Sequence, residues 1–239
     1  MTRTFKKIKL HDPLIGMIHL QFNSPPENII DIEMMKEMDF ALTEMQEALE
    51  CKVLVFSGSG PNFSCGISVD EQQHYGYQDM LRMYYRIFQE LNKLGIPTLA
   101  MVNGQCMDEG LELAAFCNFV FAERGTTFAI REISMGDFPL FTSLFLPWRV
   151  RQGMTDMLAL TGGSIPAEEA LRVGLVNHVS EPGQMETDAA MFMKEHLFPY
   201  SASSLRYANK AGRWYFNKFL DANFKDIEDH FLHGRKPNI

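Results

Sequence analysis

The chain has 239 residues, 46% of them apolar, which is enough for a sizeable hydrophobic core and argues against a disordered protein. Its 22 basic and 30 acidic residues give a net charge of −8, so the basic surface that nucleic-acid binding requires is not expected. No apolar run reaches transmembrane length, and the basic N-terminus lacks the apolar core of a signal peptide. We therefore expect a cytoplasmic protein without membrane contact.

Motifs for metals and nucleotide cofactors are missing from the sequence. The four cysteines show no CxxC spacing and lie in apolar segments, which indicates free buried thiols. His230 and His233 are close in sequence, but no third ligand accompanies them. Neither a GxGxxG nor a P-loop pattern is present. The sequence thus predicts neither a bound metal nor a separate cofactor.

The first hundred residues read as alternating strands and helices. Residues 15–22 alternate enough for a strand, and Asp31 can cap a following helix whose apolar positions recur at helical spacing. Residues 52–57 form an apolar run typical of a buried strand. Residues 77–94 then predict a helix with one aromatic and leucine-rich side, and residues 97–102 a second buried strand.

The next stretch carries the predicted active centre. A turn at 103–104 leads into an apolar helix over 111–117, and a helix start presents amides that can bind an oxygen becoming anionic. Glu112 lies within one turn of that start, and Glu132 follows after a predicted strand. The loop over 58–70 is rich in small residues, so its backbone can approach a ligand, although a plain connection explains it equally well.

The remaining segments predict a structural region. We expect helices over 168–173 and 184–197, a strand over 175–179 and a helix from Ser201 to Phe216. The last helix carries a basic stripe, for which a solvated face and contact with a ligand's phosphates both stay open. Its members are Arg206, Lys210 and Arg213.

The order of these motifs resembles the enoyl-CoA hydratase (crotonase) superfamily. The resemblance covers most of residues 13–215. It is carried by FSCGIS (63–68), NGQCMDEGLEL (103–113), FAIREISMG (128–136), LTGGSIPAEEA (160–170) and GLV (174–176).

Four further stretches resemble the cyclohexa-1,5-diene-1-carbonyl-CoA hydratases of anaerobic aromatic degradation. They are NIID (28–31), SVDE (68–71), GQC (104–106) and SASSLR (201–206). Bulky residues over 136–148 agree with a pocket for a compact ring, although an ordinary helix packed on the core explains Phe145 and Leu146 as well. Asp137 can lie near the reacting carbon.

The resemblance implies an α/β fold of repeated ββα units. Residues 1–197 would form this spiral core, and residues 198–239, shorter than in the family, a helical region for assembly into a homotrimer or a dimer of trimers. It also implies an acyl-CoA substrate, with coenzyme A brought in as part of the thioester. Backbone N–H groups of Ile67 and Glu109 would form the oxyanion hole. Further substrate contacts would come from Phe63, Ser64, Cys65, Gly66, Gly110 and Asp137.

Two carboxyl groups suit the addition of water to a double bond, because one accepts a proton from water while the other protonates carbon. By position, Glu112 and Glu132 match the family's catalytic pair, whereas either glutamate alone would be an ordinary solvated or salt-bridged side chain. The expected reaction is hydration of an α,β-unsaturated CoA thioester, with a cyclic dienoyl group as the finer expectation. Isomerisation, other enolate chemistry and a catalytically impaired CoA-binding homologue stay open.

One departure from the family pattern concerns the oxyanion turn. Asp108 and Glu109 stand where consecutive glycines are usual, and only Gly110 is retained. A carboxylate in the pocket would oppose the negative charge that develops there. We therefore expect the Glu109 side chain to point away from the pocket; otherwise the site is altered.

Overall fold

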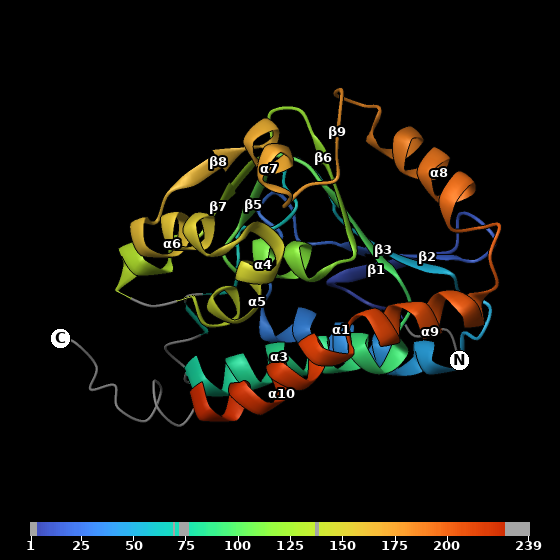
Figure 1. Ribbon diagram of the computed structural model, residues 1–239, viewed down its shortest axis with the longest axis horizontal. Coiled ribbons are helices and arrows are strands. Elements are labelled where there is room, and N and C mark those ends of the chain that lie inside the picture. Colours follow the sequence, from blue (N-terminus) through green and yellow to red (C-terminus); the bar gives the residue numbers. More distant parts are fainter. Residues whose placement is uncertain (1–3, 69, 72–76, 137–138, 228–239) are drawn as a thin grey trace.

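The computed structural model describes residues 4–68, 70–71, 77–136 and 139–227, and its centre is a six-stranded sheet (Figure 1). The strand order is β1-β2-β3-β4-β6-β9, in which β1 and β2 are antiparallel and the other neighbours parallel. Helices cover both faces, which is why β3 and β4 are apolar and buried. The strands are β1 (Ile8–His11), β2 (Met17–Phe22), β3 (Val53–Gly58), β4 (Thr98–Val102), β6 (Phe119–Glu123) and β9 (His178–Ser180).

A smaller sheet has the order β5-β7-β8 and consists of β5 (Gln105–Met107), β7 (Thr127–Ala129) and β8 (Ser164–Pro166). β4 turns directly into β5, and β6 into β7, so each of these chain segments places one strand in each sheet before a helix follows. A parallel bridge between Ser64 and Cys106 ties the loop after β3 to the smaller sheet. The predicted α/β fold of repeated ββα units is confirmed.

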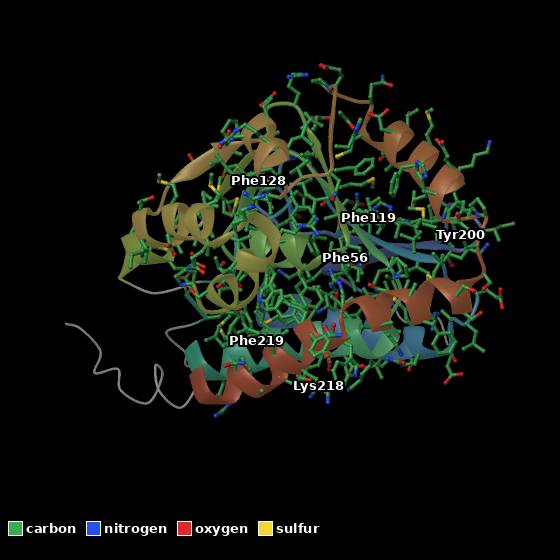
Figure 2. All side chains as sticks on the ribbon, in the orientation of Figure 1. Phe56, Phe119, Phe128, Tyr200, Lys218 and Phe219 are labelled. Carbon is green, nitrogen blue, oxygen red and sulfur yellow. The ribbon has the colours of Figure 1, made fainter. Side chains whose placement is uncertain are left out.

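Two apolar clusters hold the layers together. The larger one lies between the six-stranded sheet and α1, α3 and α4, and the smaller one between the sheet and α8. Phe56 and Phe128 lie inside the molecule, whereas Tyr200 lies at its edge (Figure 2). The helices are α1 (Ile32–Glu44), α3 (Tyr77–Leu94), α4 (Glu109–Phe116), α5 (Leu140–Val150), α6 (Gln152–Thr161), α7 (Ala167–Val173), α8 (Met185–His196), α9 (Ala202–Gly212) and α10 (Trp214–Ile227), with 3₁₀ turns η1 (Met45–Glu47) and η2 (Glu132–Met135).

The C-terminal helix differs from its prediction. Instead of one helix to Phe216, the chain forms α9 and α10 with a break at Arg213. The Arg213 guanidinium donates to the Phe116 carbonyl at 2.6 Å and lies over the Phe116 ring. Arg206 also donates to a main-chain carbonyl, that of Ala48. Two of the three residues in the predicted basic stripe therefore bind their own chain and do not form a solvated face.

The predicted boundary after residue 197 falls between α8 and α9. Beyond it, both helices bond back to the core: Asn209 accepts from Asn118 at 2.7 Å, and Asp221 accepts from Tyr85 at 2.5 Å. Treating this region as a separate unit for assembly stays a prediction. Among the helices of the described ranges, none is both long enough and apolar enough to cross a bilayer.

Candidate active site

The turn between β5 and α4 is strained, and an ion pair holds it. Asp108 has φ 52° and ψ −122°, a region that favours glycine, and such a conformation costs about 1–3 kcal/mol. Its buried carboxylate accepts from Arg131 three times, from the backbone N at 2.6 Å, from Nε at 3.0 Å and from Nη2 at 2.5 Å. Arg131 Nη2 also donates to the Cys65 carbonyl at 3.1 Å. This pair therefore joins the loop after β3, the start of α4 and the segment before η2.

Close packing brings the loop after β3 to the start of α4. A Cβ atom added to Gly110 would lie 2.8 Å from Ser64 Cβ and 2.8 Å from the Ser64 carbonyl oxygen, so only glycine permits this contact. The Ser64 carbonyl accepts from Met107 N at 2.9 Å, and its hydroxyl donates to the Asn28 carbonyl at 2.9 Å. As a result, the amide of Ile67 lies beside the first residue of α4.

Glu112 is a buried acid on a helix whose eight residues are all buried. Its side-chain Oε1 accepts from Thr142 N at 2.7 Å and from Thr142 Oγ1 at 2.9 Å, both in the first turn of α5. Burial raises the pKa of Glu112 above the ordinary value of 4.5, and the nearby Glu109 charge raises it further, while the Thr142 hydrogen bonds oppose the rise. Glu112 is thus held in one orientation and can exchange a proton near neutral pH.

Glu132 begins η2 and is 5% exposed. Among the described residues, none provides a hydrogen-bond partner for its Oε2. Burial raises the pKa of Glu132, and the neighbouring Glu112 and Glu109 charges raise it further. The two glutamates predicted as a pair therefore lie close enough for the charge of Glu112 to favour the protonated form of Glu132.

The Glu109 side chain does not point away, so that prediction was wrong. Its Oε2 accepts a hydrogen bond from the Ile67 backbone N–H at 3.0 Å, the amide predicted for the oxyanion hole. The physical reason is burial: Glu109 is 4% exposed on a helix without a solvated side, and a buried carboxylate must find a donor within the protein. The amide predicted for the oxyanion hole is thus bonded to a carboxylate in this structure.

Comparisons with known proteins assign the chain to a family. Residues 15–225 match the family described as Enoyl-CoA hydratase/isomerase. The chain belongs to this family. A cyclohexa-1,5-dienecarbonyl-CoA hydratase of Thauera aromatica is 35% identical over 198 residues, which is 83% of this chain and 76% of that protein. A short-chain-enoyl-CoA hydratase of Clostridium acetobutylicum is 30% identical over 68% of this chain and 64% of that protein, just under two thirds of its length.

A solved structure agrees on the fold. An enoyl-CoA hydratase from Mycobacterium avium subsp. paratuberculosis K-10 superposes with a TM-score of 0.86 at 20% identity, over 95% of this chain and 92% of that one. At this identity the likeness shows the crotonase fold alone. The family match and the named relatives make the chain a hydratase-type enzyme of the enoyl-CoA hydratase/isomerase family.

Two other residues predicted to bind substrate, Phe63 and Ser64, have buried side chains. Phe63 is fully buried and packs against the Phe22 ring at a centroid distance of 5.3 Å. Ser64 is buried as well, so both residues offer a ligand their main chain at most. Their substrate contacts, like those of Cys65 and Gly66, stay predictions. Asp137 lies outside the described residues.

Sequence analysis of this crotonase missed three residues that organise the site: Asp108 as an ion-pair partner, Arg131 and Thr142. Arg131 is 23 positions from Asp108, and Thr142 is 30 positions from Glu112. Contacts over such separations leave no local periodicity. Arg131 adjoins Glu132 within a family-like motif, which was the one available signal.

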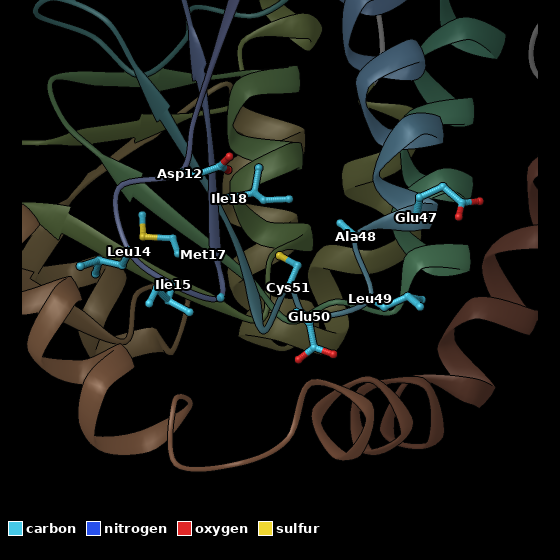
Figure 3. A pocket seen from close by; sticks show the side chains of 11 residues that line it. Asp12, Leu14, Ile15, Met17, Ile18, Glu47, Ala48, Leu49, Glu50 and Cys51 are labelled. Carbon is cyan, nitrogen blue, oxygen red and sulfur yellow. The ribbon is translucent and has the colours of Figure 1, made fainter. Parts of the chain in front are cut away.

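An open hollow of about 620 Å³ lies between the β1–β2 turn and the segment that joins η1 to β3 (Figure 3). Its walls are formed by residues 12, 14–18 and 47–51, so none of Glu109, Glu112 and Glu132 lines it. The buried acidic centre therefore lies apart from this hollow.

Proposed function

We propose that the protein adds water to an α,β-unsaturated acyl-CoA thioester, with a cyclic dienoyl group as substrate. One observation carries the reaction class: two buried acids with raised pKa, Glu112 on α4 and Glu132 at the start of η2, both feel the charge of Glu109, whose carboxylate accepts from the Ile67 amide. The cyclic acyl group is supported by similarity to the Thauera aromatica hydratase. Coenzyme A enters as part of the substrate and not as a resident cofactor.

The surroundings of the two acids favour different roles. Two donors from Thr142 stabilise the ionised form of Glu112, which suits a base that accepts a proton from the attacking water. Glu132 Oε2 has no such donor within the described structure, so its protonated form is favoured and it suits the acid that protonates the α-carbon. Water then supplies hydroxyl to the β-carbon and, by way of the two acids, a proton to the α-carbon.

The thioester oxygen carries the negative charge between these two steps. As hydroxyl adds to the β-carbon, the electrons of the double bond shift to form an enolate. Backbone N–H groups of Ile67 and Glu109 would stabilise that oxygen, each by about 3–4 kcal/mol in a water-poor site. The Glu109 amide lies at the start of α4, where the helix dipole adds to the effect.

The bulky stretch over 136–148 gives less support to a ring-shaped substrate than its composition suggested. Phe141 is fully buried, and its ring stacks on Tyr85 at 5.9 Å between centroids; Phe145 and Leu146 are buried as well. Ordinary core packing accounts for these side chains. The preference for a cyclic acyl group therefore depends on the relative and on the motifs shared with it.

The test is a hydration assay with cyclohexa-1,5-diene-1-carbonyl-CoA and crotonyl-CoA, following the gain of one water by mass. Glu112→Gln and Glu132→Gln should each lower turnover about 10²–10⁴-fold, the usual range for a lost acid or base, without changing the circular dichroism spectrum. If neither thioester gains water, hydration is wrong. Uptake of deuterium from heavy water without that gain would instead establish isomerisation, the alternative reaction of this family.

The bond between Glu109 and the Ile67 amide favours a second candidate, an impaired homologue that binds CoA esters without turning them over. A carboxylate at the oxyanion position opposes an enolate there. This candidate predicts measurable acyl-CoA binding with no hydration and no isotope exchange. Turnover of either thioester would exclude it.

We also propose a homotrimer or a dimer of trimers. Large exposed apolar side chains on α9 and α10 support this, namely Tyr207 (75% exposed), Trp214 (50%) and Tyr215 (78%). Light scattering that gives the mass of a single chain would contradict it.

A cytoplasmic location is proposed from the cysteines, because all four are free thiols. Recovery of the protein from a secreted or membrane fraction would contradict that location.

A further inference from the structure

We propose that Glu109 is an internal competitor for the oxyanion hole: its carboxylate occupies the Ile67 amide in the resting enzyme, and an incoming thioester oxygen must displace it. The inference rests on the proposed function. Its basis is the 3.0 Å hydrogen bond from Ile67 N to Glu109 Oε2 between two buried residues. Glu109 then determines how strongly the enzyme binds any ligand that carries a thioester carbonyl.

A single amide proton cannot fully serve two acceptors. In the resting structure the Ile67 N–H points at Glu109 Oε2, and the same N–H is the one that a thioester oxygen would use. A hydrogen bond to a charged group is stronger than one to a neutral carbonyl, so the carboxylate is the better acceptor until charge develops on the substrate. Binding energy from the rest of the ligand must make up this difference.

The carboxylate can leave the amide without disturbing the start of α4. Three contacts that do not involve the Glu109 carboxylate fix this part of the backbone. Tyr84 donates its hydroxyl to the Glu109 carbonyl, Asp108 is bonded to Arg131, and Gly110 packs on Ser64. The backbone of this turn can therefore stay in place when the Glu109 carboxylate leaves the Ile67 N–H.

Electrostatics favours departure of the carboxylate once a ligand arrives. Glu112, Glu132 and Asp108 are buried acids around the same turn, and the nearby cation Arg131 is already bonded to Asp108. Next to burial, the Glu109 charge is the largest contribution to the raised pKa of Glu112. Moving that charge away lowers the pKa of Glu112 and so makes it a better base when substrate is bound.

Calorimetric titration with a matched pair of ligands tests the proposal. Butyryl-CoA has a thioester carbonyl but no double bond to hydrate, and S-butyl-CoA is the thioether that lacks only the carbonyl oxygen. Glu109→Ala should tighten butyryl-CoA about tenfold or more, because the competing charged hydrogen bond is gone, and leave S-butyl-CoA within about twofold. Glu109→Gln, which keeps an acceptor but no charge, should give a smaller gain. Glu168→Ala, at a first-turn glutamate of α7 paired with Arg124, is the control and should change neither affinity.

The alternatives give different results. If Glu109→Ala and Glu109→Gln fold, as judged by their thermal transitions, and the ratio of the two affinities does not change, Glu109 is no competitor and the inference is wrong. The inference also fails if both variants weaken butyryl-CoA alone, because the carboxylate would then assist the thioester. If neither ligand binds to any form of the protein, the proposed function itself fails, and the inference fails with it.

Discussion

At the scale of single residues, Thr142 distinguishes the two catalytic candidates. Glu112 and Glu132 are the same residue type and are similarly buried, yet only Glu112 receives two hydrogen bonds from Thr142. Donors that stabilise an ionised carboxyl lower its pKa and partly offset burial. In the proposed mechanism, the difference between the acid and the base therefore depends on Thr142, a residue of α5.

Thr142→Val tests this assignment. Valine keeps the shape and the backbone N–H but removes the hydroxyl donor to Glu112, so the pKa of Glu112 should rise further. The limb of the kcat/KM profile on which activity grows with pH should then move upward by about one pH unit, the equivalent of one hydrogen bond to a charged group. Thr155→Val, at a buried threonine of α6 that bonds the Arg151 carbonyl, should leave the limb in place. A limb that stays or moves downward in Thr142→Val would show that Glu112 is not the base.

At the scale of elements, the site depends on three segments held by one ion pair. Asp108 precedes α4, Arg131 precedes η2, and Cys65 lies in the loop after β3. Asp108 has a positive φ, a backbone conformation that glycine adopts at the least cost in free energy. The hydrogen bonds from Arg131 compensate for the cost that an aspartate has in this conformation.

Asp108→Asn should weaken this junction. Asparagine tolerates a positive φ but carries no charge, so the bonds from Arg131 become neutral on the acceptor side. Because the Arg131 side chain is 43% exposed, we expect a loss of only about 1–2 kcal/mol in the free energy of unfolding. Urea denaturation at pH 7 measures it. Asp79→Asn, which changes an exposed pair with Arg82 on α3, should cost less than about 0.5 kcal/mol. Equal losses in the two variants would contradict a special role for Asp108.

Long elements, which repeat their apolar pattern over several turns, could be predicted from the sequence. Short strands could not. α3 has the predicted bounds Tyr77–Leu94, because apolar residues recur along five turns, and Asp31 caps α1 through the Met34 amide as expected. β5, β7 and β8 have three residues each, too few to show alternation. The break at Arg213 was missed because a buried partner, the Phe116 carbonyl, lies 97 residues away.

In the site, too, some features could be predicted from the sequence and others depend on tertiary packing. Glu112 and Glu132 were predicted as a pair because a family motif gives their positions; both are buried, and the Glu112 charge raises the pKa of Glu132, whereas their catalytic role stays a prediction. The direction of the Glu109 side chain depends on whether α4 has a solvated side. The sequence of α4 alone does not show whether the helix has a solvated side. The packing of α5, the loop after β3 and the smaller sheet around α4 determines it.

At the scale of the whole molecule, the site is a cost to stability. Glu109, Glu112 and Glu132 are buried together, and in Glu112 and Glu132 burial raises the pKa in the folded state. The folded protein therefore keeps protons that the unfolded chain releases above the ordinary value of 4.5. A raised pKa of an acid means that stability falls as pH rises above 4.5.

His19 on β2 works in the opposite sense. It is bonded to Ser57 at 2.8 Å, and burial lowers its pKa from 6.5 to about 4. Between these values the unfolded chain binds the extra proton, so this histidine makes stability rise with pH. The wild-type profile sums both effects, and comparison with single variants separates them.

Glu132→Gln should therefore flatten the loss of stability with rising pH. The glutamine cannot release a proton on unfolding, so the slope of the unfolding free energy above pH 4.5 should become less negative by up to about 1.4 kcal/mol per pH unit, the value for one proton. His19→Gln should shift the slope the other way, and only between about pH 4 and 6.5. Urea titrations at pH 5, 6, 7 and 8 give these slopes. A Glu132→Gln slope identical to that of the wild type would mean that Glu132 is already ionised in the folded protein, and its role as proton donor to carbon would then be untenable.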